Sequence, residues 1–224
     1  MEIIQKTSQV NTTAAKNRKI EYIVIHYTAG LSSANGKAAA TAAYFAKDTT
    51  KASADFIVDD NNVVQFNPDI ANRYTWHCGG SKIGSRGGQY YNRCTNKNSI
   101  GIEICSNNAL NKVTAANDEN WFFTDDAVLL ATELTKKLMA DYNIPVENVI
   151  RHYDVTGKFC PGIVGWNPET EDESEWENFK NALLEHDDAI SLEEDIIPND
   201  YGELLKAYNE LKAKYDAIVQ IVNS

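Results

Sequence analysis

Residues 149–162 read VIRHYDVTGKFCPG and place His152 and Cys160 on either side of a turn at Gly157. The histidine follows a short apolar run that is typical of a strand. A histidine and a cysteine spaced in this way can both point at one metal ion, but two ligands do not make a metal site. The assignment of fold and function therefore depends on whether the rest of the chain supplies the remaining ligands.

A second strand-like run also leads to a histidine. Residues 20–28, IEYIVIHYT, are apolar and β-branched, which indicates a buried strand with His26 at its end. If this strand and the run before His152 are neighbours, both histidines emerge at the same edge of one sheet, and Cys160 is the natural third ligand. A thiolate with two imidazoles suits zinc better than magnesium or calcium, which prefer oxygen. Each histidine taken alone is also typical of a hydrogen-bonded structural residue.

The composition is that of an ordinary soluble domain. The chain has 224 residues, 43% hydrophobic and 24% charged, enough for one domain of about 150–200 residues and an appendage. Its net charge of −11 argues against binding to nucleic acid, because that attraction needs clustered Lys and Arg. The start has no signal-peptide pattern, and no run approaches the roughly 20 apolar residues of a membrane span. We therefore expect synthesis in the cytoplasm without a membrane anchor.

The four cysteines are expected to be free thiols or metal ligands rather than a disulfide framework. Cys78 and Cys94 can still pair if the protein works outside the cell. Cys105 is interpreted as a small buried thiol rather than a second nucleophile.

Alternating strands and helices fill most of the chain. We expect a helix over residues 36–48, two strands around an Asp-Asn turn over 53–66, an extended loop over 77–98 and a strand over 99–106. A helix over 124–143 begins at Thr124 as its N-cap, and an amphipathic helix near 176–183 closes the domain.

The strand over 99–106 carries a second chemical group. Its alternation puts Ile100, Ile102 and Ile104 on one face and leaves Glu103 on the other. A hydrolase needs a proton acceptor and a stabiliser for the developing oxyanion. Glu103 is the candidate base, and Lys158, two residues before Cys160, is the candidate electrophile. From the residues alone, an edge-strand carboxylate and a solvated loop lysine are equally good interpretations.

The C-terminal part has a different character. Acidic residues dominate 187–199, which is typical of a solvated linker. In residues 200–224 apolar positions step by three and four, which predicts a helix with a heptad seam, an oligomerisation or targeting element. A helix docked on its own domain explains the pattern equally well. We thus divide the chain into a domain over 1–186, a linker and a C-terminal helix.

As an ordered set, these segments resemble the zinc-dependent N-acetylmuramoyl-L-alanine amidases of the type 2 amidase family, which includes peptidoglycan-recognition proteins. The resemblance covers about residues 18–185. It rests on IVIHYTAG (23–30), WHCGG (76–80), NSIGIEICSN (98–107), VIRHYDVTGKFCPG (149–162) and WENF (176–179). It implies an α/β fold with a central mixed sheet flanked by helices, and a zinc ion on the floor of an open groove.

The resemblance also assigns roles to residues. It makes His26, His152 and Cys160 the zinc ligands and Glu103 the residue that activates or orients the attacking water. Lys158 matches an oxyanion-stabilising position, and His77 matches one that lines the cleft.

The chain departs from the family pattern at two neighbouring positions. Where many relatives have a SAHY-like segment, it reads SADF, so that Asp55 stands at a position expected to contact substrate. Ala54 stands where some relatives use a catalytic tyrosine, which leaves that role to Glu103.

The implied reaction is hydrolysis of the amide between N-acetylmuramic acid and L-alanine in bacterial peptidoglycan. The absence of a signal peptide and the small tail are most similar to a phage or prophage endolysin, which reaches the wall after another protein opens the membrane. Two alternatives stay open. One is a peptidoglycan-recognition module with a structural zinc, and the other is a regulatory protein whose C-terminal heptads bind a partner helix.

Overall fold

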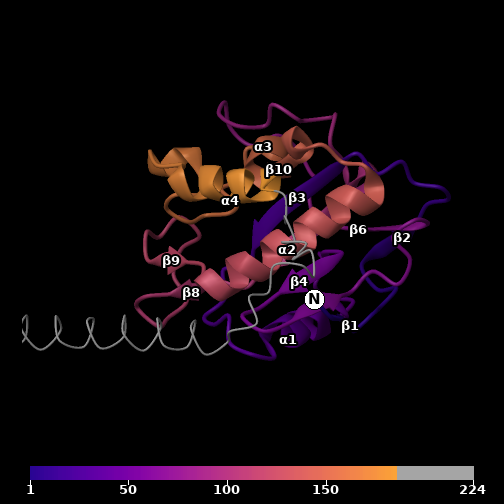
Figure 1. Ribbon diagram of the computed structural model, residues 1–224, viewed down its shortest axis with the longest axis horizontal. Helices are drawn as coiled ribbons and strands as arrows, with labels where there is room; N and C mark the ends of the chain where they lie inside the picture. The colour runs from indigo at the N-terminus through magenta and orange to yellow at the C-terminus, as the bar shows by residue number, and fades with distance from the viewer. Residues whose placement is uncertain (186–224) are drawn as a thin grey trace, which may run out of the picture. The chain divides into compact units, whose positions relative to one another are not determined.

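The computed structural model describes residues 1–185, which form a sheet with helices on both faces (Figure 1). The predicted linker over 187–199 and the predicted C-terminal helix lie outside the described residues. The central sheet has six strands in the order β1-β5-β4-β7-β3-β10. The neighbours β4 and β5 are antiparallel and the other pairs are parallel, so the expected mixed sheet is confirmed.

The strands of the central sheet are β1 (Ile3–Gln5), β3 (Tyr22–Tyr27), β4 (Phe56–Val58), β5 (Val63–Gln65), β7 (Ser99–Ile104) and β10 (Val149–Arg151). Two small antiparallel pairs join β2 (Thr12–Ala14) to β6 (Arg73–Thr75) and β8 (Asn107–Asn108) to β9 (Trp121–Phe122). The helices are α1 (Lys37–Phe45), α2 (Asp125–Tyr142), α3 (His152–Thr156) and α4 (Ser174–Leu184). Short 3-10 helices span Asn96–Asn98, Val146–Asn148 and Pro168–Thr170.

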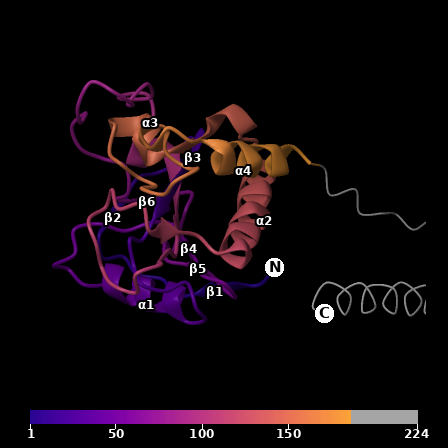
Figure 2. The ribbon, with the colours of Figure 1, turned by 90° about the vertical axis from the view of Figure 1, so that its left-hand side faces the viewer.

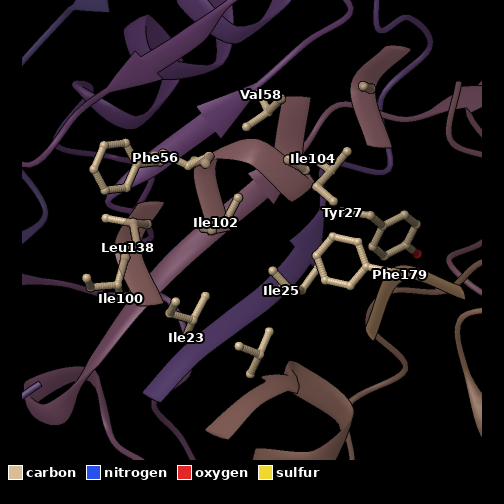
Figure 3. Packing of buried hydrophobic residues seen from close by; sticks show 14 of the residues in the cluster. Ile23, Ile25, Tyr27, Phe56, Val58, Ile100, Ile102, Ile104, Leu138 and Phe179 are labelled. Atoms are coloured by element: carbon tan, nitrogen blue, oxygen red, sulfur yellow. The ribbon is translucent and has the colours of Figure 1, made fainter. Parts of the chain in front are cut away.

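The two central strands, β3 and β7, divide their side chains between the faces of the sheet. On one face Ile23, Ile25 and Tyr27 of β3 pack with the three isoleucines of β7, as Figure 3 shows. The isoleucines are fully buried, and burying such a side chain contributes about 1.5–3 kcal/mol to folding. The alternation expected for residues 99–106 is therefore confirmed, and it turns Glu103 toward the opposite face.

Helices α2 and α4 cover the face formed by these isoleucines, and α1 and α3 lie on the other side of the strands (Figure 2). Thr124 begins α2 as expected, since its hydroxyl accepts a hydrogen bond from the backbone N–H of Ala127 at 3.4 Å. Trp176, Phe179 and Leu183 of α4 are buried in the same core. Both helix predictions are confirmed.

The β4–β5 hairpin explains how α1 is placed. Asp59 in its turn accepts hydrogen bonds from the backbone N–H groups of Asn61 and Asn62 at 3.0 and 2.8 Å. Its other carboxylate oxygen accepts from the N–H of Ala38, in the first turn of α1, at 2.9 Å. One buried aspartate therefore closes the predicted turn and fixes the start of the helix that borders the site described next.

Candidate metal centre and cleft

The two histidines leave adjacent strands at one edge of the sheet. β3 and β10 pair in parallel, with Ile25 opposite Arg151, so the next residues are His26, still in β3, and His152, which begins α3 directly after β10. Cys160 lies close to both histidines because its carbonyl accepts a hydrogen bond from the N–H of Tyr153, the residue after His152, at 2.9 Å. All three side chains are buried. The convergence expected from the sequence is what the structure contains.

The donor atoms of these residues surround one point. Nδ1 of His26 lies 3.1 Å from Nδ1 of His152 and 3.7 Å from Sγ of Cys160. All three candidate ligand atoms lie within 4.8 Å of one another. Burial and the neighbouring His152 lower the pKa of His26, and burial and Lys158 lower that of His152 to about 3, so both imidazoles are neutral and offer lone pairs. Two neutral imidazoles and a thiol form a donor set that fits zinc.

Burial raises the pKa of the Cys160 thiol to about 12, and the nearby Glu103 adds to the rise. Lys158 and a hydrogen bond from the backbone N–H of Tyr27 act in the opposite direction. A divalent cation at the three donors would lower the pKa of the Cys160 thiol, because a coordinated thiol loses its proton. Metal binding here is therefore expected to release a proton from Cys160.

A hydrogen-bonded relay sets the tautomer of His26. The Ser99 hydroxyl donates to the carbonyl of Thr95 at 2.6 Å, so its oxygen accepts from Nε2–H of His77 at 3.1 Å. Nδ1 of His77 is then an acceptor and takes the Nε2–H of His26 at 3.1 Å. His26 consequently presents the lone pair of Nδ1 to the other donors. A hydrogen bond to the second ring nitrogen is how proteins orient a metal-binding histidine.

Gly101 makes room for this relay. A Cβ atom at this position would lie 2.6 Å from Cγ of His77, closer than non-bonded atoms approach. The His77 ring therefore lies against the bare backbone of β7. Sequence reasoning did not single out Ser99 or Gly101. The available signal was a glycine between two isoleucines inside a strand, which marks a close approach of another group.

Glu103 lies directly across from His26 in the β3–β7 register. Its Oε2 atom is buried and has no hydrogen-bond partner among residues 1–185. Burial raises the pKa of Glu103 to about 8, against the opposing charge of Lys158. A buried carboxyl oxygen that has no hydrogen-bond partner in the described part of the chain, on a residue that lines the same cleft as the three donors, is suited to hold a proton or a water molecule.

A cleft of about 570 Å³ gives access to this cluster, and Lys158 is an exposed residue in its wall. Side chains of α1, the segment after β3 and the loop before Cys160 form the walls, and the donors and Glu103 lie at the base. The lining includes His26, Leu31, Lys37, Tyr44, Trp76, His77, Glu103, His152, Lys158, Phe159 and Cys160. His77 borders the cleft, at the kind of position that the resemblance implied.

Asp55 has a different place from the one expected. It is 0% exposed, and its carboxylate accepts hydrogen bonds from Asn67, Thr75 and the N–H of Gly101 at 2.6–2.8 Å. The guanidinium of Arg18 lies 4.0 Å away, also with no exposed side-chain surface. Asp55 therefore balances a buried cation inside the fold, which corrects the expectation that it contacts substrate. The neighbouring Ala54 is likewise buried.

Comparison with known proteins agrees with this geometry. The N-acetylmuramoyl-L-alanine amidase family (Amidase_2) matches residues 16–163. Over 140 residues, 62% of this chain, the sequence is 34% identical to the N-acetylmuramoyl-L-alanine amidase XlyA of Bacillus subtilis (strain 168). That alignment covers 39% of XlyA, so the chain spans less than half the length of this curated relative.

Solved structures with a similar fold belong to the same kind of enzyme by their names. A mutant endolysin from Bacillus subtilis is 31% identical, with a TM-score of 0.55, over 81% of this chain and 98% of that one. The catalytic domain of XlyA is 29% identical, with a TM-score of 0.54, over 82% and 99%. The matched residues 16–163 contain all three candidate ligands and Glu103. The chain belongs to the N-acetylmuramoyl-L-alanine amidase family.

Proposed function

We propose that this protein is a zinc-dependent amidase that hydrolyses the bond between N-acetylmuramic acid and L-alanine in bacterial peptidoglycan. The observation that carries the proposal is the position of Glu103. A carboxyl oxygen with no hydrogen-bond partner within residues 1–185 lines the same cleft as the three candidate metal ligands. A purely structural metal site is closed by its ligands and has no use for such a group.

Each residue at the base has a distinct task in this reaction. His26, His152 and Cys160 would hold zinc, which would supply Lewis-acid chemistry that makes the attacking water more acidic. Glu103 takes a proton from the attacking water and can pass it to the departing amide nitrogen. Burial raises the pKa of Glu103 to about 8 in the metal-free protein, and a cation held by the three ligands would lower it and favour the carboxylate that accepts the proton.

Lys158 supports the charge that develops on the substrate. Its side chain is exposed in the cleft wall, and its charge acts on Glu103, His152 and Cys160. We infer that the ammonium stabilises the carbonyl oxygen as this becomes an oxyanion. His77 contacts His26 rather than the reacting atoms, so its role is to position a ligand.

The cleft is consistent with a polymeric substrate. It is lined by Tyr44, Trp76 and Phe159, whose faces can stack on sugar rings, and by Lys37, which can pair with a carboxylate of a stem peptide. The relatives named above are amidases and an endolysin. On that basis we propose that the protein acts on the cell wall. No helix among residues 1–185 is long and apolar enough to cross a membrane.

Two variants separate an amidase from a binding module with a structural zinc. Cys160→Ser removes a ligand, so we expect the purified protein to lose zinc and activity together. Glu103→Gln keeps the shape of the side chain, so we expect a normal zinc content with turnover reduced about 10²–10⁴-fold. If Glu103→Gln retained near-normal turnover, the assignment of the base would be wrong. If the wild-type protein bound zinc and peptidoglycan without cleaving it, the binding module would be the better description.

A further inference from the structure

Two cysteines that the proposed reaction does not use lie together beneath the sheet. Cys78 and Cys94 are each 2% exposed and share a buried cluster with Tyr22, Val24 and Val155. Sγ of Cys78 lies 3.6 Å from the hydroxyl of Ser99. The interaction with Cys94 lowers the pKa of Cys78, and the interaction with Cys78 raises the pKa of Cys94. They are therefore neighbours with unequal acidity.

Hydrogen bonds to the backbone hold the two segments that carry the cysteines in place. The side-chain oxygen of Asn96 accepts hydrogen bonds from the N–H groups of His77 and Cys78 at 3.1 and 2.8 Å. The N–H of Cys94 is bonded to the carbonyl of Tyr90 at 2.9 Å. Asn96 thus ties the segment around Cys78 to the segment just after Cys94. The segments that carry the two cysteines are therefore already held next to each other.

The pair lies in the wall of a cavity. Both cysteines line a cavity of about 280 Å³ whose wall includes Gly79, Gly80 and Asn92. The residues 79–86 that follow Cys78 are exposed. Cys105 and Cys160 are differently placed, since Cys105 packs against α1 and Cys160 belongs to the candidate metal centre. Only the Cys78–Cys94 pair, among the cysteines of residues 1–185, combines a thiol neighbour with a cavity.

We propose that Cys78 and Cys94 form a redox-active dithiol that closes to a disulfide by exchange with a small-molecule disulfide. The thiolate of Cys78 attacks one sulfur of the reagent, giving a mixed disulfide and releasing one thiolate. The thiolate of Cys94 then attacks the Cys78 sulfur and releases the second. The two protein thiols lose two electrons, the reagent gains them, and the two thiol protons end on the two released thiols.

The cross-link would close the exposed loop between residues 78 and 94. This loop braces α3, because the N–H groups of Ile83, Gly88 and Tyr90 donate to carbonyls of Thr156, Tyr153 and Asp154 at 2.6–2.9 Å. His152 is the first residue of α3. A disulfide over a loop of this length restricts the unfolded chain, and we expect Tm to rise by roughly 6–12 °C.

The test uses the full chain with added zinc, incubated with oxidised or with reduced glutathione. After oxidation we expect two of the four thiols to be lost, a mass about 2 Da lower and a single cross-linked peptide joining Cys78 to Cys94. Cys105→Ala is the matched control and should lose the same two thiols with the same rise in Tm. Cys94→Ala should show neither the cross-link nor the rise.

Three results would overturn the proposal. The first is a wild-type protein that keeps all four thiols in oxidised glutathione, and the second is one that stops at a mixed disulfide. The third is a cross-link that involves Cys105 or Cys160. Thiol counting and peptide mapping need no amidase activity, so failure here leaves the proposed function untouched.

Discussion

Replacing His77 with alanine removes the group that orients a metal ligand without touching the three donors. Nδ1 of His77 accepts the Nε2–H of His26 at 3.1 Å, and both rings are buried. Without this acceptor the imidazole of His26 can rotate or change tautomer, and its buried N–H is left without a partner. Loss of such an outer partner typically weakens metal binding 10–100-fold, which corresponds to about 1.4–2.8 kcal/mol.

The assay is a competition titration of zinc between the protein and a chromophoric chelator, at fixed pH and salt. His77→Asn is the matched control, because the asparagine oxygen can occupy the place of Nδ1 and accept from His26 while the bond to Ser99 is lost. We expect His77→Ala to raise the Kd for zinc about 10–100-fold and His77→Asn to recover most of the affinity. Circular dichroism at saturating zinc verifies that both variants are folded.

An unchanged Kd in a folded His77→Ala variant would refute the reasoning, since the relay would then have no part in holding His26. Equal losses in the alanine and asparagine variants would also contradict it, because the acceptor at Nδ1 would not be the feature that matters.

Three other substitutions test the surroundings of the relay. Gly101→Ala places a Cβ 2.6 Å from Cγ of His77 and should displace the ring. We expect the zinc affinity to fall about as far as in His77→Ala. A normal zinc affinity would mean that the ring has room to move. Asp55→Ala leaves the buried Arg18 without a counter-charge. We expect urea titration to show a free energy of unfolding lower by about 3–5 kcal/mol, with KM unchanged. A raised KM at normal stability would instead support the interpretation that Asp55 contacts substrate. In zinc-free protein, Glu103 has a folded pKa of about 8 against an ordinary 4.5, so the folded state keeps a proton that the unfolded state loses. Stability should therefore fall as pH rises through this interval by on the order of a few kcal/mol, and Glu103→Gln should flatten the dependence; parallel pH profiles would contradict this.

The donor cluster could be predicted because its geometry follows from local patterns. Two apolar runs each lead to a histidine, and parallel neighbours carry equivalent positions to the same edge of a sheet. Cys160 follows on a loop too short to travel far. The alternation in β7 likewise fixed the face on which Glu103 lies. In each case a short stretch of sequence decides where the side chain points.

Asp55 shows where this reasoning ends. The resemblance placed Asp55 at a position expected to contact substrate, but its side chain turns inward to a cation that lies 37 positions earlier in the chain. No local pattern reveals that Arg18 is buried and needs a counter-charge. The relay from Ser99 through His77 to His26 is hidden for the same reason, since it joins three segments that meet only in the folded sheet.

Digestion of purified peptidoglycan with and without a zinc chelator tests the central claim most directly. Two products are measured, new amino termini of L-alanine and new reducing sugar ends. An amidase predicts new L-alanine termini without reducing ends, lost with the chelator and restored by added zinc. Reducing ends without new amino termini, or cleavage that persists in the chelator, would contradict the assignment of His26, His152 and Cys160 to a catalytic zinc.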